Sequence, residues 1–289
     1  MAVVSGALDG IERVLAAHLR PGDRVVIENP GWPAMADLVR AMLLRPVPND
    51  NDEQGLVPQS LQSVLGGHDA AVLTSRVQNP TGACTSAGRA RTLVAILDGF
   101  PDLLVVEDDH AGPISGSGLC AIGPGRRRWA LAASVSKAIG PDLRIAALFG
   151  DPATIEAVRG RQGVGPGWVS HLLQRIAGAV ISEHHGTFVR ATDPYHERRE
   201  GLLTALAAQG LTINAPSGLN VWVPVPDPAS AVAACLEAGY AVRSGDAFVL
   251  DDSRAVRVTT SRMTPSQASD VARVLAGSTA TGRRHTRSG

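Results

Sequence analysis

The sequence predicts an α/β fold in which a mostly parallel, doubly wound sheet is followed by a smaller C-terminal α+β domain. Short apolar runs alternate with helical patterns through the first half of the chain, which is the pattern of βα units around a parallel sheet. The composition, with 44% hydrophobic and 19% charged residues, is that of an ordinary globular protein with a dry core.

Five apolar runs are expected to form the sheet of the large domain: RVVIEN, AAVLTS, LLVVEDD, WALAAS and RIAALFG. Patterns such as ALDGIERVLAAHL and SAGRARTLVAILDGF lie between them and are expected to be helices that cover the faces of the sheet. Because ligands bind at the carboxyl ends of parallel strands, the residues that follow each run are the candidates for a site.

Beyond Asp151 the pattern turns helical, with interruptions expected at Gly167 and Pro194, and these helices are expected to join two domains. We assign residues 1–190 to the large domain with its interdomain helices, 191–277 to the small domain, and 278–289 to a disordered tail. In the small domain LTINAP, NVWVPV, AFVL and AVRVTT are expected to be strands, and SAVAACLEAGY and PSQASDVARVLAG to be helices.

Charge and cysteine content argue against several classes of function. The formal net charge is zero, which removes the basic footprint of a dedicated nucleic-acid binder. The three cysteines are widely spaced and form no C-x-x-C pattern, so they predict neither a disulfide framework nor a zinc site. No apolar run approaches the roughly 20 residues of a membrane span, and no signal peptide follows Met1. We therefore expect a cytoplasmic protein without a membrane partner.

Lys137 is the only lysine of the chain, because every other basic residue among its 27 Lys plus Arg is an arginine. Arginine stays protonated near neutral pH, whereas a lysine amine can lose its proton and attack a carbonyl. A coding bias that left one lysine by chance is the alternative, and the surrounding residues decide against it. Lys137 lies in SVSKAIGPDLR directly after the run WALAAS, so it should face the ligand-binding edge of the sheet.

Three residues near Lys137 suit a phosphate group. Ser134 and Ser136 offer hydroxyl donors, and Arg144 offers a permanent cation. A lysine beside a phosphate pocket suggests pyridoxal phosphate as the cofactor.

Through the motif S-x-S-K-x-x-x-P-x-x-R, the chain resembles the fold type I aminotransferases of class I and II, and more closely the aminotransferase-like domain of MocR regulators. The resemblance implies that Lys137 binds pyridoxal phosphate covalently, that Arg144 and Ser134 hold its phosphate, and that Ser136 supports them. It also implies a homodimer that takes amino acids and 2-oxo acids. Relatives carry an N-terminal arm, and MocR regulators an upstream helix-turn-helix domain. We therefore expect an N-terminally truncated chain that does not itself bind nucleic acid.

Four further landmarks of the family occur in the same order along the chain, the last of them at the run LLVVEDD. Ser5, Gly6 and Ala7 lead into the helix expected over 7–19, whose free N–H groups would bind the phosphate, although a plain Ser N-cap is the alternative. Trp32 would stack on the pyridine ring or else pack in the core. Asn79 of the turn NPTG would lie beside the phenolic oxygen of the cofactor, although these residues also form an ordinary turn.

The run LLVVEDD ends in three acids and is followed by a histidine. The resemblance assigns Asp108 to the pyridine nitrogen of the cofactor, a pairing that makes the ring an electron sink. Asp109 should point away and cap a turn, because neighbouring strand residues face opposite sides, and for the same reason no metal site is predicted here. His110 stands where most relatives carry tyrosine and is expected to reach the phenolic oxygen from the face that carries Asp108.

Arg257 lies inside the run AVRVTT, where a buried arginine is costly unless it is paired. The resemblance implies that it binds the α-carboxylate of the substrate, while Arg254 and Arg262 offer rival alignments and a salt bridge across the domain interface is the alternative.

Two functions from different classes follow from these residues. The leading hypothesis is transamination between an amino acid and a 2-oxo acid, with Lys137 as general base and acid. The alternative is an effector-sensing domain of a MocR-type regulator, which binds the cofactor and a ligand amine without turnover. A degenerate subunit that supports an intact partner is a third hypothesis.

Overall fold

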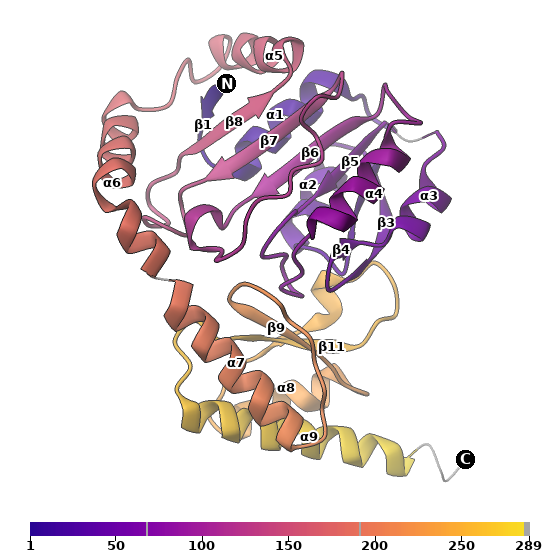
Figure 1. Ribbon diagram of the computed structural model, residues 1–289. Helices are drawn as coiled ribbons and strands as arrows, with labels where there is room; N and C mark the ends of the chain where they lie inside the picture. Colours follow the sequence, from indigo (N-terminus) through magenta and orange to yellow (C-terminus); the bar gives the residue numbers. More distant parts are fainter. Residues whose placement is uncertain (68, 191, 286–289) are drawn as a thin grey trace.

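The computed structural model describes residues 1–67, 69–190 and 192–285. Within them, an eight-stranded sheet forms the centre of the large domain in the order β1-β8-β7-β6-β5-β2-β3-β4 (Figure 1). Its strands are β1 (Ala2–Val4), β2 (Arg24–Asn29), β3 (Arg45–Asp52), β4 (Gly55–Leu56), β5 (Ala70–Leu73), β6 (Leu104–Asp109), β7 (Trp129–Ser134) and β8 (Ala146–Gly150).

The sheet is mostly parallel, as the sequence predicts. Strands β3, β2, β5, β6 and β7 run parallel, whereas β1, β4 and β8 pair antiparallel with their neighbours. The five predicted runs form β2, β5, β6, β7 and β8. Strand β3 was not expected, because its sequence RPVPNDND is polar and contains two prolines. It tolerates them because residues 45–50 pair only with β2, which leaves the other edge of that stretch without a partner strand.

Helices cover both faces of the sheet, which confirms the doubly wound fold. One face packs against α1 (Ala7–His18), α2 (Pro33–Ala41) and α5 (Pro152–Gly163), and the other against α3 (Pro58–Val64) and α4 (Ala87–Leu97). Strand β2 shows the alternation that produces this sandwich, since Val25 and Ile27 join the first core and Val26 joins the second. Parallel strands buried on both faces read as continuous apolar runs, which is why they were recognisable from the sequence.

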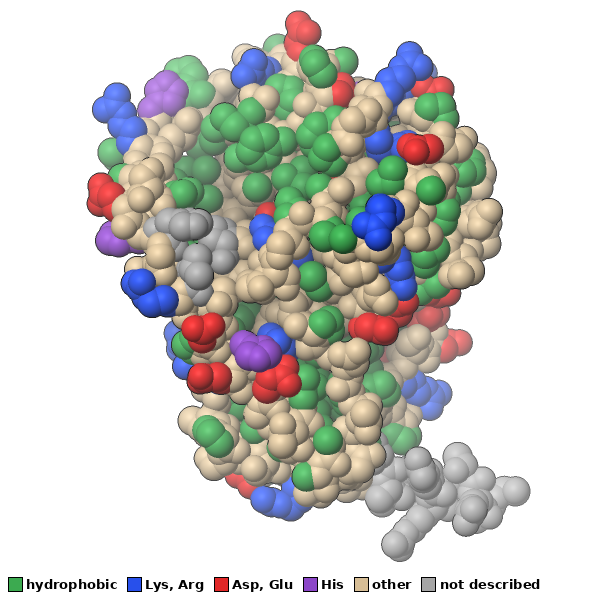
Figure 2. Space-filling view, in the orientation of Figure 1, with side chains coloured by type: hydrophobic (Ala, Val, Ile, Leu, Met, Phe, Trp, Pro, Cys, Tyr) green, Lys and Arg blue, Asp and Glu red, His purple; other side chains and the backbone are tan. Residues whose placement is uncertain are grey.

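Part of the second face is open. Figure 1 draws no described helix in front of β7 and β8, and Figure 2 shows hydrophobic side chains gathered there. The side chain of Phe149 on β8 is 40% exposed. Helix α6 (His171–Arg190) continues from this face toward the small domain and leaves Leu172 68% exposed. It has a kink at His184.

The small domain contains a three-stranded antiparallel sheet in the order β10-β11-β9, covered by helices. Its elements are α7 (Thr192–Ala208), β9 (Asn220–Pro224), α8 (Pro228–Glu237), β10 (Arg243–Ser244), β11 (Ala255–Thr259) and α9 (Pro265–His285). Leu202 and Leu206 of α7, Val256 of β11 and Leu275 of α9 meet in its core.

Three expectations for the small domain were wrong. The segment LTINAP forms no strand, although Leu211 and Ile213 still pack against the core. Its alternating pattern therefore reflects the burial of every second side chain and not pairing with another strand. The segment AFVL forms no strand: Ala247 and Phe248 end the 3-10 helix η2 (Gly245–Phe248), at whose start the Ser244 side chain accepts a hydrogen bond from the Asp246 amide. Residues 278–285, expected to be disordered, continue helix α9, and residues 286–289 lie outside the described residues.

Hydrogen bonds join the two domains at the carboxyl edge of the large sheet. The Gly31 amide donates to the Phe248 carbonyl at 2.8 Å, and the Ser217 hydroxyl donates to the Gly82 carbonyl at 2.7 Å. Among the described helices, none combines the length and apolar character needed to cross a membrane.

Candidate functional site

A cavity of about 950 Å³ lies where the carboxyl ends of the parallel strands face the small domain. It is lined by all the residues predicted for the site except Ser5 and Gly6, namely Ala7, Trp32, Asn79, Asp108, His110, Ser134, Ser136, Lys137, Arg144 and Arg257. These residues come from six separate parts of the chain, and the strand ends bring them together. The structure therefore gathers the predicted residues into one place.

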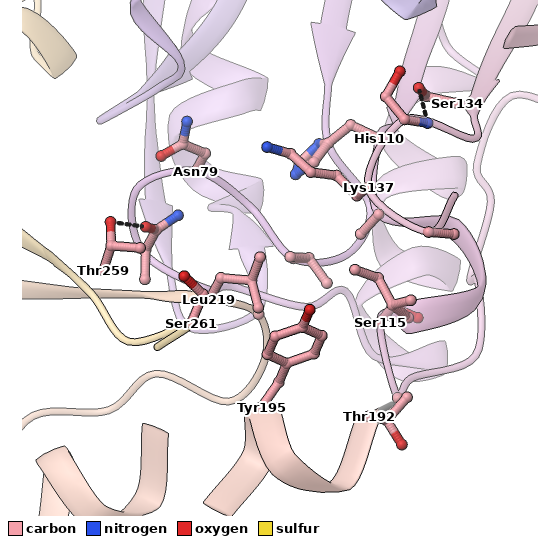
Figure 3. Close-up of a pocket in the computed structure, with 18 of the residues that line it drawn as sticks. Asn79, His110, Ser115, Ser134, Lys137, Thr192, Tyr195, Leu219, Thr259 and Ser261 are labelled. Carbon is pink, nitrogen blue, oxygen red and sulfur yellow. Dashed lines mark hydrogen bonds between the residues drawn. The ribbon is translucent and has the colours of Figure 1, made fainter. Parts of the chain in front are cut away.

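Lys137 lies in the turn that follows β7, and its amine points into the cavity between Asn79 and His110 (Figure 3). The turn is held from within, because the Ser136 amide donates to Ser134 Oγ at 3.2 Å and the Ser136 hydroxyl donates to the Leu143 carbonyl at 3.5 Å. These hydrogen bonds position the backbone of Lys137, and neither of them involves its amine.

Arg144 and the N-terminus of α1 lie at one end of the cavity. Ala7 and Leu8, the first residues of α1, line it together with Ser134 and Arg144. The N-terminus of a helix carries unpaired N–H groups and a partial positive charge, which add to the charge of the guanidinium. This part of the cavity is therefore suited to a phosphate.

Gly6 sets how closely Arg144 approaches the start of α1. A Cβ at Gly6 would lie 2.6 Å from Arg144 Nη2. Gly6 also has a φ of 108°, a backbone conformation that residues other than glycine rarely adopt. Because Gly6 has no side chain, the guanidinium of Arg144 can occupy the space beside it. Ser5 is exposed, and its amide donates to Asp9 Oδ2 at 2.8 Å, so its contact is with the helix and not with the cavity.

Asp108 is 4% exposed at the end of β6, and its two oxygens have different surroundings. Oδ2 lies 3.6 Å from His110 Nδ1, whereas Oδ1 is buried and has no hydrogen-bond partner among the described residues. A buried carboxylate oxygen without a donor is costly, so this site has the chemistry to receive a donor from a ligand in the cavity.

The acids on either side of Asp108 have other partners. Glu107 accepts hydrogen bonds from the amides of Ile122 and Gly123 at 3.0 and 2.8 Å, on the opposite side of the strand. Asp109 forms a two-fold ion pair with Arg76 and accepts from the Gly112 amide, so it does cap the following turn. Of the three acids, only Asp108 lines the cavity.

The charge of Asp108 controls His110. Burial by itself lowers the pKa of the imidazole, but its hydrogen bond to Asp108 and the attraction of that carboxylate outweigh burial, so the pKa of His110 is raised. The positive charge of Lys137 opposes this rise. His110 therefore stays protonated to a higher pH than a free histidine, and lies on the face that carries Asp108, as strand alternation predicts.

Arg257 and Asn79 face each other across the domain boundary. Arg257 Nη1 donates to Asn79 Oδ1 at 3.0 Å, which leaves the amide nitrogen of Asn79 as the group that can donate into the cavity. The guanidinium of Arg257 also lies over the ring of Phe248, 5.0 Å from its centroid. No carboxylate of the described chain forms an ion pair with Arg257, so the alternative considered for it, a salt bridge across the domain interface, is not formed in this part of the chain.

Arg254 and Arg262, the rivals of Arg257 for the substrate carboxylate, differ in position. Arg254 donates to the Pro226 carbonyl and does not line the cavity, whereas Arg262 is exposed and does line it.

Trp32 both lines the cavity and packs against the core, so the two alternatives for it are compatible. Trp168 lies outside the cavity, where it is 69% exposed.

Sequence reasoning missed the wall that α7 contributes. Thr192 and Tyr195 of α7 line the cavity, as do Ser115 and Ser117 of the loop after β6 (Figure 3). The helical pattern over 194–210 indicated an interdomain helix, but periodicity alone does not tell which face of a helix lines a site. Leu8 was also missed, since its apolar side chain gives no hint that it borders an anion site.

Comparison with known proteins identifies the family. Residues 1–275 match the sequence profile described as Aminotransferase class I and II. The chain belongs to this aminotransferase family. Solved aminotransferases share the fold: kynurenine aminotransferase from Pyrococcus horikoshii, in complex with PMP, superposes with a TM-score of 0.86 at 21% identity over 96% of this chain and 74% of that one.

Regulators are also among the relatives of this aminotransferase-family chain. It is 37% identical to the vitamin B6 salvage pathway transcriptional repressor PtsJ of Salmonella typhimurium, over 93% of this chain and 64% of PtsJ. It is 27% identical to the regulator TauR of Rhodobacter capsulatus over 78% of this chain and 47% of TauR, and 27% identical to an aspartate aminotransferase of Rhizobium meliloti over 75% and 55%. The chain thus spans less than two thirds of the length of these curated relatives.

Replacing Gly6 with alanine should weaken anion binding at the start of α1 by roughly tenfold or more, because the new methyl group would displace Arg144. The dissociation constant for inorganic phosphate, measured by calorimetry, tests this. Gly22→Ala is a matched control: Gly22 has a φ of 97°, but no atom lies within 4 Å of its added Cβ. Equal phosphate affinity in the Gly6→Ala variant and the wild type would contradict the role of Gly6.

Proposed function

We propose that the chain binds pyridoxal phosphate in this cavity and transfers an amino group between an amino acid and a 2-oxo acid. The observation that carries the proposal is the placement of the Lys137 amine in one cavity with two cationic ends, Arg144 on one side and Arg257 on the other, and with the buried carboxyl of Asp108. A molecule with a phosphate and a pyridine nitrogen, joined to one with an α-carboxylate, matches this arrangement of charges.

Two features of the cavity fit the cofactor. The buried, unpartnered Oδ1 of Asp108 can accept from a protonated pyridine nitrogen, and the space kept free at Gly6 lets Arg144 reach a phosphate at the start of α1. Ser134 and the amide groups of Ala7 and Leu8 would complete the phosphate contacts. Bound there, pyridoxal phosphate supplies an electron sink for negative charge at the α-carbon of the substrate.

The remaining polar groups can hold the cofactor ring in a defined orientation. The amide nitrogen of Asn79 and the imidazole of His110 would donate to the phenolic oxygen, since the amide oxygen of Asn79 is already held by Arg257. Trp32 would lie against the ring and exclude water from it. Arg257 would bind the α-carboxylate as a two-pronged donor and thereby aim the α-hydrogen of the substrate.

Lys137 is proposed to do the proton work. Its amine would hold pyridoxal phosphate covalently and, once freed by a bound amino acid, would act as the base that takes the α-proton of the substrate and as the acid that gives a proton back. Asp108 would accept a hydrogen bond from the pyridine nitrogen and so favour its protonated form.

A second candidate function is the sensing of a ligand amine without turnover, in the manner of a regulator's effector domain. The observation that favours it is the 37% identity to the repressor PtsJ over 93% of this chain, higher than the 27% identity to the aspartate aminotransferase. Such a domain would use Lys137, Asp108 and Arg257 to bind the same ligands but would release no 2-oxo acid. Neither candidate assigns nucleic-acid binding to this chain.

Borohydride reduction of the protein loaded with pyridoxal phosphate should fix the cofactor on Lys137, and peptide mass mapping locates the label. Label found only on the N-terminal amine would overturn the assignment, because the chain has no other lysine. Incubation with an amino donor and a 2-oxo acid then separates the two functions. New amino acid formed by the wild type and lost in Lys137→Ala supports transamination, whereas an absorbance change without product supports sensing.

Replacing His110 with tyrosine should move the colour transition of the cofactor-loaded protein to higher pH, by about one unit, because it removes a cation beside the cofactor. An absorbance titration of the loaded variant measures the shift. His171 lies outside the cavity, so His171→Asn serves as the control and should leave the transition in place. Identical titrations of the wild type and both variants would show that His110 does not contact the cofactor.

We also propose that the protein is a homodimer. Exposed hydrophobic side chains support this: Figure 2 shows such side chains gathered over β7 and β8, where Phe149 of β8 is 40% exposed. Trp168, before α6, and Leu172, in α6, are 69% and 68% exposed. Sedimentation equilibrium at micromolar concentration should give twice the mass of the chain. A monomer that binds pyridoxal phosphate tightly would contradict this assembly.

A further inference from the structure

Arg76, in the loop after β5, connects two loops at the edge of the cavity without lining it. Its Nε and Nη2 atoms donate to the two oxygens of Asp109 at 2.8 and 2.6 Å. Its Nη1 atom donates to Ser115 Oγ at 3.0 Å and to the Ser117 carbonyl at 2.7 Å. The side chains of Arg76 and Asp109 are 14% and 5% exposed, so this pair is largely shielded from water.

The segment held by Arg76 forms one wall of the cavity. We call residues 114–117 the β6 wall, and all four of them line the cavity. Inside the wall, the Ser115 hydroxyl donates to the Ser117 carbonyl at 2.9 Å and accepts from the Ser117 amide at 3.2 Å. At its tip, a Cβ on Gly116 would lie 3.5 Å from Thr192 Cβ, so the wall reaches α7 of the small domain.

The position of the β6 wall identifies what it would contact. Figure 3 places Ser115 and Tyr195 on the side of the cavity away from Asn79, and Asn79 is the residue that Arg257 binds. A substrate whose α-carboxylate lies on Arg257 and whose amine lies at Lys137 has its side chain left to extend across this remaining space. The β6 wall and Tyr195 therefore border the side-chain end of the ligand.

We infer that Arg76 is a positioning residue: its fork fixes the β6 wall, and the wall determines how well the side chain of the amino acid is bound. This inference rests on the proposed binding of an amino acid at Lys137. A planar guanidinium is needed because it must reach both Asp109 oxygens and two acceptors of the wall at fixed angles, which an ammonium group cannot do. Asp109 is the last residue of β6 and directly follows Asp108, so it anchors the fork, and with it the wall, at a fixed place beside Asp108.

Arg76→Lys is the direct test, because it keeps the positive charge beside Asp109 and removes the fork. With cofactor-loaded protein, amino acid binding is followed by the absorbance change on adding L-alanine, L-glutamine or L-leucine. The apparent dissociation constant should rise roughly tenfold for the two longer amino acids and less than about threefold for L-alanine, because only the longer side chains reach the wall. The affinity for pyridoxal phosphate should stay within about twofold of the wild type.

Arg89→Lys is the matched control. Arg89 makes the same kind of fork, with Asp52 at 3.0 and 2.6 Å and the Leu56 carbonyl at 2.7 Å, but on β3 and β4 and away from the cavity. Both variants keep the positive charge but lose a comparable set of guanidinium hydrogen bonds, so both should lower the melting temperature. Only Arg76→Lys should change the discrimination between long and short amino acids.

Hydrogen exchange provides a readout that does not depend on ligand binding. Amides of residues 111–117 should exchange faster in Arg76→Lys, and in the second variant Asp109→Asn, while amides of β7 keep their protection. If the wild type responds to L-glutamine or L-leucine and Arg76→Lys responds with the same affinities, or if residues 111–117 keep their protection in both variants, the inference is wrong and the proposed function stands. A wild type that responds to none of the three amino acids would overturn the proposed amino acid site and this inference with it.

Discussion

The buried carboxyl of Asp108 is the constraint on which the site depends. Removing a carboxylate from water is costly, and Asp108 has one neighbour, His110, and one oxygen without a donor among the described residues. The fold accepts this cost at the end of a central parallel strand, where both faces are covered and the side chain opens onto the cavity. The negative charge of Asp108 raises the pKa of His110, and the other carboxylate oxygen can accept a hydrogen bond from a ligand in the cavity.

The alternation of side chains along β6 gives its three acidic residues different contacts. Because neighbouring strand residues face opposite sides, Asp108 lines the cavity while Glu107 and Asp109 lie on the other side of β6, where they bind a loop and Arg76. One strand end thus supplies both the carboxylate that faces the cavity and the carboxylate that holds Arg76. Asn79 likewise combines two contacts, because it lines the cavity and its amide oxygen accepts a hydrogen bond from Arg257 of the small domain.

Much of the site could be predicted because its residues follow recognisable strands. Lys137, Asp108 and Asn79 each come directly after an apolar run, and the parallel order of those runs brings them to one edge. Side chains that act through tertiary contacts gave no such signal. Arg76 is one arginine among many in the sequence, and Tyr195 lines the cavity only because α7 packs with one particular face inward. The polar strand β3 was missed because it departs from the apolar pattern of its neighbours.

Glu28 is a buried carboxyl group near the boundary between the two domains, and its pKa is strongly raised. It lies at the end of β2, where burial, stronger than the hydrogen bonds from Thr74 and Gln78, raises its pKa from 4.5 to about 7, and the charge of Asp108 adds to the rise. A raised pKa means that the folded chain binds this proton more tightly than the unfolded chain. The contribution of Glu28 to stability is therefore fully present below pH 4.5 and is lost as the pH rises through about 7. Gln78 donates to Glu28 and also to the Pro30 carbonyl at 2.8 Å, beside the Gly31 amide that binds the small domain, so Glu28 is connected through Gln78 to the segment that joins the two domains.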